Sequence, residues 1–539
     1  MPFAILFCTL LFSLWFFSVK ANIAHVERLT GNGTEQSPLH IEFVSTGFFG
    51  YDHHEPTSLS YNAPAVTTGL QRLRQLYPQH RWTSTFITDP QSPSCPFMPG
   101  NVYFMLSQWY YSRRNSSRLS IIVTPACTEG SPMNEFAGAH NILLITSAAA
   151  DLEIRDRQRS PTWLSTTPFA SANAVFCSLL NNLNWTTVFA SLDSQEKVVM
   201  YHAYAFMRVT TKLTDCGVLF TASKTSYSDD ASVRQTLGEF NSKSRVFLYF
   251  GQPLGLRILL LAATELGMTK GDHAYLAVVP WSSPAFGYFT WQLNADDDEK
   301  VKEAYRSVLL LSLVDEEQYG SQSVRNLAQE WVNISRTAYN NTELPSELPL
   351  PVVTATHAAM ELAGIAVIEA LARNGGLAVG DNGKMLADSI RNRTYPDLQA
   401  GLWRISSIGV VLHNIQLASF DWEDGQLKVF MKATEMDLRV QGRETYIWRK
   451  TTSKPIWHGR NVLPPAVPVC GLDGAACYSG NHRWIAQAAG SSAAVLVALT
   501  GIIGVFAQKF QVQRAVWWIL EPQTLSTRNG KASINGSRV

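Results

Sequence analysis

Hydrophobic positions near the start of the chain switch between the period of a strand and that of a helix. Residues 39–46 alternate as a strand does. Val66, Leu70, Leu73 and Tyr77 then recur at spacings of four, three and four, with polar residues on the other faces. The same switch continues along the chain. It predicts strands at 81–88, 119–125 and 142–146 and an aromatic helix at 102–113.

A second series with the same alternation begins near Thr162. Its predicted helices span 171–183, 198–209 and 254–266, and its predicted strands span 186–191, 217–222, 245–250, 274–279 and 308–313. Alternating strands and helices favour parallel strands joined by right-handed crossovers. We therefore expect an α/β fold with two lobes, each an open sheet covered by helices on both faces.

Two later segments add a buried helix and a hairpin. The stretch 352–372 is almost entirely apolar, so we expect a helix buried between the lobes. His357 on this helix is expected to be a core histidine with an internal partner, and the alternative is a ligand contact. The turn Asp424-Gly425 predicts a β-hairpin between 418–422 and 427–432.

An uncharged run extends from Trp484 to Gln508. A helix of these 25 residues is about 37 Å long, whereas the hydrocarbon core of a bilayer is about 30 Å thick. The run predicts a transmembrane helix, and the alternative is a buried core helix. Five basic residues and one acidic residue follow it, whereas 464–484 has no net charge. This asymmetry predicts a type I plasma-membrane protein whose amino-terminal part is extracellular.

The start of the chain indicates the same orientation. Residues 2–19 are apolar and rich in Phe and Leu, which predicts a signal peptide cut after Ala21, with an uncleaved anchor as the alternative. The expected layout is a signal peptide at 1–21, a bilobed extracellular domain at 22–450, a juxtamembrane stalk at 451–483, the membrane helix at 484–508 and a short cytoplasmic tail at 509–539.

The charge balance and the cysteine content indicate which partners and which cellular compartment to expect. Lys plus Arg number 44 against 43 Asp plus Glu, so the chain has no global attraction to nucleic acid. Once Cys8 leaves with the signal peptide, an even number of cysteines remains, which predicts three disulfides in an oxidising compartment, with neighbours pairing in order. The six are Cys95, Cys127, Cys177, Cys216, Cys470 and Cys477. Glycosylation sequons are expected to be used at Asn32, Asn115, Asn184, Asn333, Asn340 and Asn392.

The sequence contains none of the common catalytic motifs that we considered. It contains no GxSxG, HExxH or GxGxxG sequence, no P-loop and no kinase signature. The acidic run 296–299 lacks the spacing of a calcium loop and is expected to start a helix. The pair His53-His54 is expected to lie in a loop rather than to bind a metal. We therefore predict no catalytic residue, no metal site and no bound cofactor.

The juxtamembrane residues resemble a known family. Trp457-His458-Gly459, Pro464-Pro465, the Pro-Val-Cys-Gly sequence at 468–471 and the second cysteine Cys477 are similar to the stalk of receptor guanylyl cyclases and natriuretic peptide receptors. Pro161-Thr162-Trp163 resembles the entry of these receptors into their second lobe. Together the similar segments extend over most of 39–510.

The resemblance implies a type I periplasmic-binding-protein-like ectodomain that binds an extracellular ligand, often a peptide, as a homodimer. It also implies disulfides between Cys95 and Cys127, between Cys177 and Cys216, and between Cys470 and Cys477. The turn 124–127 stands where the family has a glycine-rich GPGC turn. Because Thr124 and Ala126 replace the glycines, the chloride site of natriuretic receptors is in question here.

Three functions follow as hypotheses. The first is a single-pass receptor or decoy for a peptide or small-molecule ligand, without enzymatic output. The second is a fragment of a receptor guanylyl cyclase, since Val516-Trp517-Trp518-Ile519 resembles the start of that family's cytoplasmic region and the sequence ends soon afterwards. The third is a subunit of a ligand-gated channel or a G-protein-coupled receptor, which the single predicted span disfavours.

Two groups of residues are candidate contact sites. Ligands of open α/β lobes bind outside the carboxyl ends of the strands, which selects Thr124, Ser147, Asp193 and Gly251, with turn or cap roles as the alternative. In the helix 102–113, one face carries Val102, Leu106 and Trp109 and is expected to pack on the first sheet. The remaining aromatic residues are expected to form a homodimer contact unless the loop 91–100 covers them. These are Tyr103, Phe104, Tyr110 and Tyr111.

Overall fold

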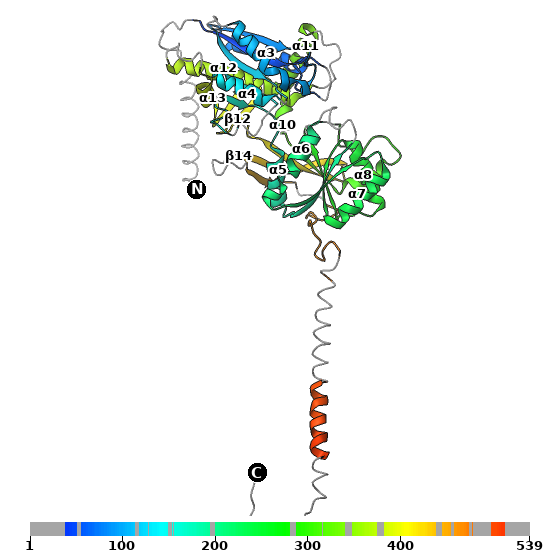
Figure 1. Ribbon diagram of the computed structural model, residues 1–539. Coiled ribbons are helices and arrows are strands. Elements are labelled where there is room, and N and C mark those ends of the chain that lie inside the picture. The colour runs from blue at the N-terminus through cyan, green and yellow to red at the C-terminus, as the bar shows by residue number, and fades with distance from the viewer. Residues whose placement is uncertain are drawn as a thin grey trace, which may run out of the picture. The chain divides into compact units, whose positions relative to one another are not determined.

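The structure is a computed structural model in which the chain forms two compact units, 1–467 and 468–539 (Figure 1). It describes residues 38–50, 55–113, 118–127, 129–148, 154, 156–194, 200–280, 287–314, 316–339, 348–374, 382–437, 445–453, 457–473, 477 and 497–511. The predicted signal peptide 1–21, the pair His53-His54 and the tail beyond 511 lie outside these residues, as do the sequons at Asn32, Asn115 and Asn340.

The first lobe is built on a five-stranded sheet in which every neighbouring pair is parallel. Its order is β2 (Arg81–Thr88), β1 (His40–Gly47), β3 (Leu119–Thr124), β4 (Leu143–Thr146) and β5 (Trp163–Ser165). Adjacent apolar residues point to opposite faces, as Phe43 and Val44 do, so the strands feed two separate cores.

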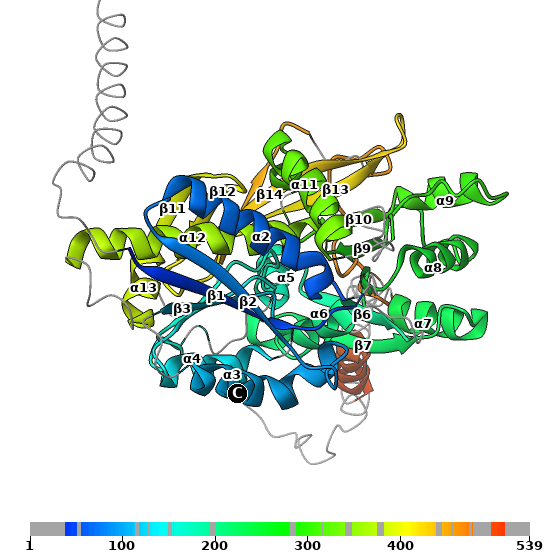
Figure 2. The ribbon, with the colours of Figure 1, turned by 90° about the horizontal axis from the view of Figure 1, so that it is seen from above.

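Helices cover both faces of this sheet. One core joins it to α2 (Leu59–Leu76), α12 (Leu350–Asn374) and α13 (Gly383–Ile390). The opposite core joins it to α3 (Met98–Ser112) and α4 (Gly130–Ala139). Figure 2 shows α3 and α4 on one side of β1 and β3, and α2 and α12 on the other.

The second lobe has an eight-stranded mixed sheet. Its order is β15 (Thr445–Lys450), β14 (Gln426–Met436), β13 (Asn414–Asp421), β10 (Val308–Ser312), β9 (Ala274–Val279), β8 (Val246–Phe250), β6 (Thr187–Asp193) and β7 (Leu219–Thr225). The five strands from β10 to β7 are parallel, and β13 to β15 add antiparallel pairs. The predicted hairpin is confirmed, with Gly425 at φ 69° in its turn.

The helices of this lobe also lie on both faces. One face packs on α5 (Ala172–Asn182) and α6 (Met200–Thr210). The other packs on α7 (Asp230–Lys243), α8 (Pro253–Glu265) and α9 (Asp298–Tyr305). The acidic run starts α9 as expected: Asp298 accepts hydrogen bonds from the backbone N–H groups of Leu293 and Asn294 and pairs with the buried Arg257 at 2.7 Å.

Helix α12 corrects one expectation. By length and composition it is apolar enough to cross a membrane, yet 89% of its most apolar window is buried, so it is a core helix. It lies within the first lobe, against α2 and the sheet, rather than between the lobes. The close approach needs a small residue, since a Cβ on Gly69 would lie 2.6 Å from Met360 Cβ.

His357 on α12 is a core histidine, as predicted. It is fully buried, and its Nδ1 forms a 3.0 Å hydrogen bond with Thr68 Oγ1. Burial lowers the pKa of His357 to about 4, so the ring is neutral at physiological pH. One helical turn away, burial raises the pKa of Glu361 to about 7, although its Oε2 accepts the Gln399 backbone N–H at 2.9 Å.

The segment assigned to the stalk packs on the second lobe as far as Ala466. Trp457 is buried in that lobe and donates from Nε1 to the Gly271 carbonyl at 2.8 Å. Trp185 donates to the Pro464 carbonyl at 2.8 Å, and the Ala466 carbonyl accepts from Arg245 at 3.0 Å. The chain therefore leaves the first unit from a fixed point near Val467.

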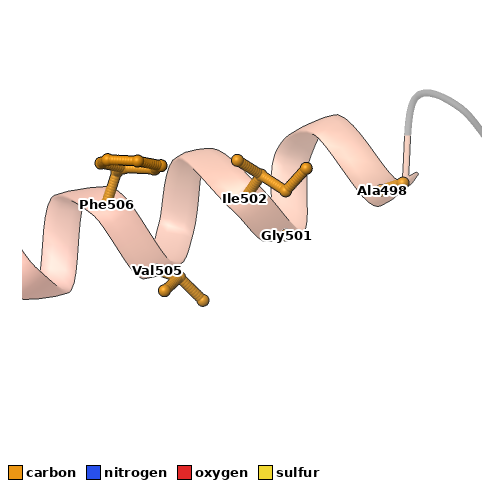
Figure 3. A pocket seen from close by; sticks show the side chains of 5 residues that line it. All are labelled: Ala498, Gly501, Ile502, Val505 and Phe506. Carbon is orange, nitrogen blue, oxygen red and sulfur yellow. The ribbon is translucent and has the colours of Figure 1, made fainter.

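Only the last part of the predicted membrane helix lies among the described residues, where Val497–Gln511 forms a short apolar helix. Ile502 and Phe506 project from one side of it, next to Gly501 and Ala498, and Val505 projects from another (Figure 3). The small residues leave a shallow hollow on this exposed helix. Apolar side chains exposed all round a helix suit contact with lipid or with another helix.

Candidate functional site

The first two ligand-site candidates lie side by side at the carboxyl ends of β3 and β4. The Ser147 backbone N–H donates to the Thr124 carbonyl at 3.0 Å. Both side chains are fully buried and hydrogen bonded internally: Thr124 Oγ1 donates to the Thr46 carbonyl at 2.7 Å, and Ser147 Oγ lies 2.6 Å from Thr356 Oγ1. These hydroxyl hydrogen bonds join the end of β3 to β1 and the end of β4 to α12.

The other two candidates form a second pair in the second lobe. A Cβ on Gly251 would lie 2.7 Å from Asp193 Cβ and 2.6 Å from the Tyr249 hydroxyl, so a side chain at 251 has no room. Asp193 is 5% exposed. Burial raises the pKa of Tyr249, whose hydroxyl donates to the Gln252 carbonyl at 2.7 Å and stays neutral. The four candidates thus form two buried pairs, and their contact with a ligand stays a prediction.

The turn that carries Thr124 is stabilised by a disulfide and a carboxylate. Ala126 adopts φ 48°, a left-handed conformation that glycine adopts more easily. The next residue, Cys127, is bonded to Cys95, and its backbone N–H donates to Glu129 Oε2 at 2.9 Å. An internal carboxylate therefore accepts the amide hydrogen bond at this turn.

All three predicted disulfides are confirmed. The structure pairs Cys95 with Cys127, Cys177 with Cys216, and Cys470 with Cys477. The first bond anchors the start of α3 to the turn after β3, and the second joins α5 to the segment before β7. Of the described sequon asparagines, all are exposed, as carbohydrate attachment requires: Asn184, Asn333 and Asn392.

A row of exposed aromatic side chains lies along helix α3 and is here called the aromatic stripe: Phe97, the residue directly before the helix, and Phe104 and Tyr111 within it. Their exposed fractions are 55%, 70% and 58%. Phe104 and Tyr111 are seven residues apart, which places them on one helical face, and Phe97 precedes Phe104 by the same interval. The opposite face packs on the sheet through the fully buried Val102 and Leu106, as predicted. The segment 91–100, which was the alternative cover, leaves Phe104 and Tyr111 exposed.

Tyr103 and Tyr110, which are next to the stripe on α3, pack against other aromatic rings. Tyr103 is 46% exposed and packs edge-on against Phe136 of α4, with ring centroids 5.8 Å apart. Tyr110 is half-buried and lies 4.2 Å from the His140 ring. Burial lowers the pKa of His140, which favours its neutral form. Of the four predicted dimer residues, three are therefore open to solvent and Tyr110 is partly covered.

Both ends of α3 are fixed, so the stripe is rigidly held. At the start, Asn101 donates to Ser92 Oγ at 2.7 Å, next to the disulfide at Cys95. At the end, Arg113 forms a 2.6 Å ion pair with the buried Glu42 on β1 and lies over the Trp109 ring. The prediction missed Phe97 because it started the helix at Val102. The signal was present, since the seven-residue repeat from Phe97 can be read in the sequence.

Comparison with known proteins shows what the chain is similar to. The family described as "Receptor family ligand binding region" matches residues 101–412, which include parts of both lobes. "Atrial natriuretic peptide receptor 3" of Rattus norvegicus is 21% identical over 197 residues, 36% of this chain and 37% of the relative. The receptors of that name from Bos taurus and Homo sapiens are 21% and 20% identical over 197 residues. The match spans little more than a third of these relatives.

Proposed function

Because the chain belongs to the receptor ligand-binding-region family, we propose that it is a single-pass cell-surface receptor whose first unit binds an extracellular peptide. The observation that carries the proposal is the family match over 101–412, which falls on two α/β lobes linked by three crossings of the chain. The relatives are named as receptors of atrial natriuretic peptide, so a natriuretic-type peptide is the proposed ligand class.

The proposed placement is the plasma membrane, with the first unit outside the cell. Three disulfides suit an oxidising compartment, and the exposed sequon asparagines suit a secreted surface. The uncharged run 484–508 and the basic excess after it support a type I orientation.

The proposed assembly is a homodimer formed through the aromatic stripe of α3. Phe104 and Tyr111 lie about 10 Å apart along the helix and Phe97 lies at its amino-terminal end, so a two-fold axis would bring each stripe onto its own copy. Exposed aromatic rows of this kind mark contact sites on soluble domains. Because α3 is rigidly anchored, its ordering adds little to the entropic cost of association.

We propose no catalytic role for this region, since its family is a ligand-binding one. No bound cofactor is proposed either. At the family's chloride turn, Glu129 already accepts the Cys127 amide, which makes a second anion at that amide electrostatically unfavourable.

Binding by the full chain on the surface of transfected cells tests the ligand proposal. A fluorescent atrial-type natriuretic peptide should bind saturably and be displaced by the unlabelled peptide. A scrambled peptide with the same disulfide and net charge is the control for charge-driven adsorption. Equal retention of both peptides would reject the natriuretic ligand class. Cells that display the chain but retain neither peptide would do the same.

A further inference from the structure

The chain crosses between the lobes three times, and these crossings form the hinge. Their described residues are 166–171 after β5, 313–314 and 316–321 after β10, and 406–413 before β13. The third crossing runs beside the end of β5, from which the first crossing leaves: the Ser165 backbone N–H donates to the Gly409 carbonyl at 2.8 Å, and the Val411 backbone N–H donates to the Ser165 carbonyl at 3.2 Å. Any change in lobe orientation must bend these paired segments.

One ionisable pair spans this hinge. His413, in the third crossing, is 6% exposed and lies 2.8 Å through Nδ1 from Glu435 Oε2 on β14. Its Nε2 lies 2.9 Å from the carbonyl oxygen of Thr167 in the first crossing. The backbones are joined as well, because the Glu435 backbone N–H donates to the His413 carbonyl at 2.9 Å. The His413 backbone N–H also donates to the Glu435 side chain at Oε2, at 3.1 Å.

Both ring nitrogens of His413 therefore face oxygen atoms. A neutral imidazole has one N–H and one lone pair, so either tautomer would turn a lone pair toward the Thr167 carbonyl or the Glu435 carboxylate. An imidazolium donates to both oxygens. A protonated Glu435 beside a neutral ring satisfies the same geometry with the same number of protons. Both ring nitrogens of His413 are therefore hydrogen bonded only when the pair carries one extra proton. The reference is the state with a neutral histidine and an ionised glutamate.

We propose that His413 and Glu435 form a proton-operated clasp on the hinge, closed while the pair holds this proton and loosened when the proton leaves. The clasp ties the first crossing to the third and to the end of β14, so its loss frees the segments that must bend. By linkage, the affinity of any ligand that prefers one lobe orientation then varies with pH.

Three other charged or titratable groups lie on or beside the elements that carry the clasp, and two of them are hydrogen bonded to a neighbouring segment. Asp437, the residue after β14, accepts from the Ser407 backbone N–H at 2.6 Å. Arg404 on β12 (Gly401–Ile405) donates to Asn414 Oδ1 at 3.0 Å. Tyr446 on β15 lies opposite Glu435 in the sheet register. The first crossing, 166–171, contributes no titratable side chain.

Hydrogen exchange of the ligand-free full chain tests the clasp. Amide protection of 406–414 and 433–437, corrected for the intrinsic pH dependence of exchange, should fall roughly tenfold or more from pH 5.5 to 8. The core strand β8 serves as the internal reference. Hinge protection that follows β8 at every pH would overturn the proposal, and it needs no variant.

Two substitutions sharpen the test. In Glu435→Gln the amide donates to Nδ1 of a neutral ring while Nε2–H still donates to Thr167, so both ring contacts form without the extra proton, and only the hydrogen bond from the His413 backbone N–H to Oε2 is lost. Hinge protection should then stay level or rise with pH. His413→Gln, which cannot gain a proton, should remove the pH step while β8 stays protected. A step that persists in both folded variants would assign it to other groups and sink the proposal. Because no ligand is present, failure here leaves the proposed receptor function untouched.

Discussion

Replacing Phe104 with glutamate should break the proposed dimer without unfolding the lobe. Phe104 is 70% exposed at the centre of the aromatic stripe, so the folded monomer loses little packing. In a two-fold contact each copy would bury this ring. Full burial of such a side chain contributes about 1.5–3 kcal/mol, so the exposed part contributes about 1–2 kcal/mol per copy.

Each substitution removes two rings from one dimer. The loss is then about 2–4 kcal/mol, or a dissociation constant raised roughly 30-fold to 1,000-fold. Burying two carboxylates at the same contact adds a further penalty. At micromolar concentration a dimer of moderate affinity should become a monomer.

Sedimentation velocity of the secreted first unit, 1–467, measures this shift directly. Leu254→Glu is the matched control, since Leu254 is 61% exposed on α8 in the other lobe and lies outside the stripe. The parent and this control should sediment as dimers, and Phe104→Glu and Tyr111→Glu as monomers. A folded Phe104→Glu variant that sediments with the parent would refute the assignment of the contact to α3.

Three further predictions concern stability and activity. Because burial raises the pKa of Glu361 to about 7, above its usual 4.5, the carboxyl binds a proton more tightly in the folded state. The parent therefore gains stability as pH falls from 7 toward 4.5, and Glu361→Gln should be more stable by about 1–3 kcal/mol in urea unfolding at pH 8 but not at pH 5. Gly383→Ala should cost about 1–3 kcal/mol, since its Cβ would clash with the backbone of Ile142 and Leu143, whereas Gly138→Ala meets no neighbour and should be neutral or stabilising. The purified 539-residue chain should form no cyclic GMP from GTP, and measurable product would reverse this expectation.

Much of the fold can be predicted from the sequence because each strand and helix carries its own hydrophobic period. The strand at 81–88 matches β2 residue for residue, since alternation and flanking turns define it locally. Helix α12 shows the limit of this reasoning. An all-apolar helix must be buried, but its pattern does not say in which core, and tertiary contacts with α2 place it in the first lobe.

The candidate sites show a similar division. Six cysteines allow fifteen pairings, of which their clustering in sequence favours pairing of neighbours, and the family resemblance implied the same three pairs. The positions of Thr124 and Ser147 at neighbouring strand ends followed from the alternation of elements. Their internal hydrogen bonds did not, because a hydroxyl's partner depends on segments far apart in sequence, as with Ser147 and Thr356. The hinge pair could not be predicted from the sequence for the same reason, since His413, Glu435 and Thr167 come together only in the folded chain.

The stripe and the hinge pair should act independently in the unliganded chain. Helix α3 packs on one face of the first sheet, whereas the hinge leaves from β5 and β12, and the residues of the two sites have no side-chain partner in common among those described. Sites without shared partners usually contribute additively. Phe104→Glu should therefore leave the pH step in hinge exchange unchanged, and Glu435→Gln should leave the dimer affinity unchanged at pH 5.5 and at pH 8. A shift in dimer affinity on changing Glu435 would show that the first lobe transmits hinge strain to α3, and additivity would have to be abandoned.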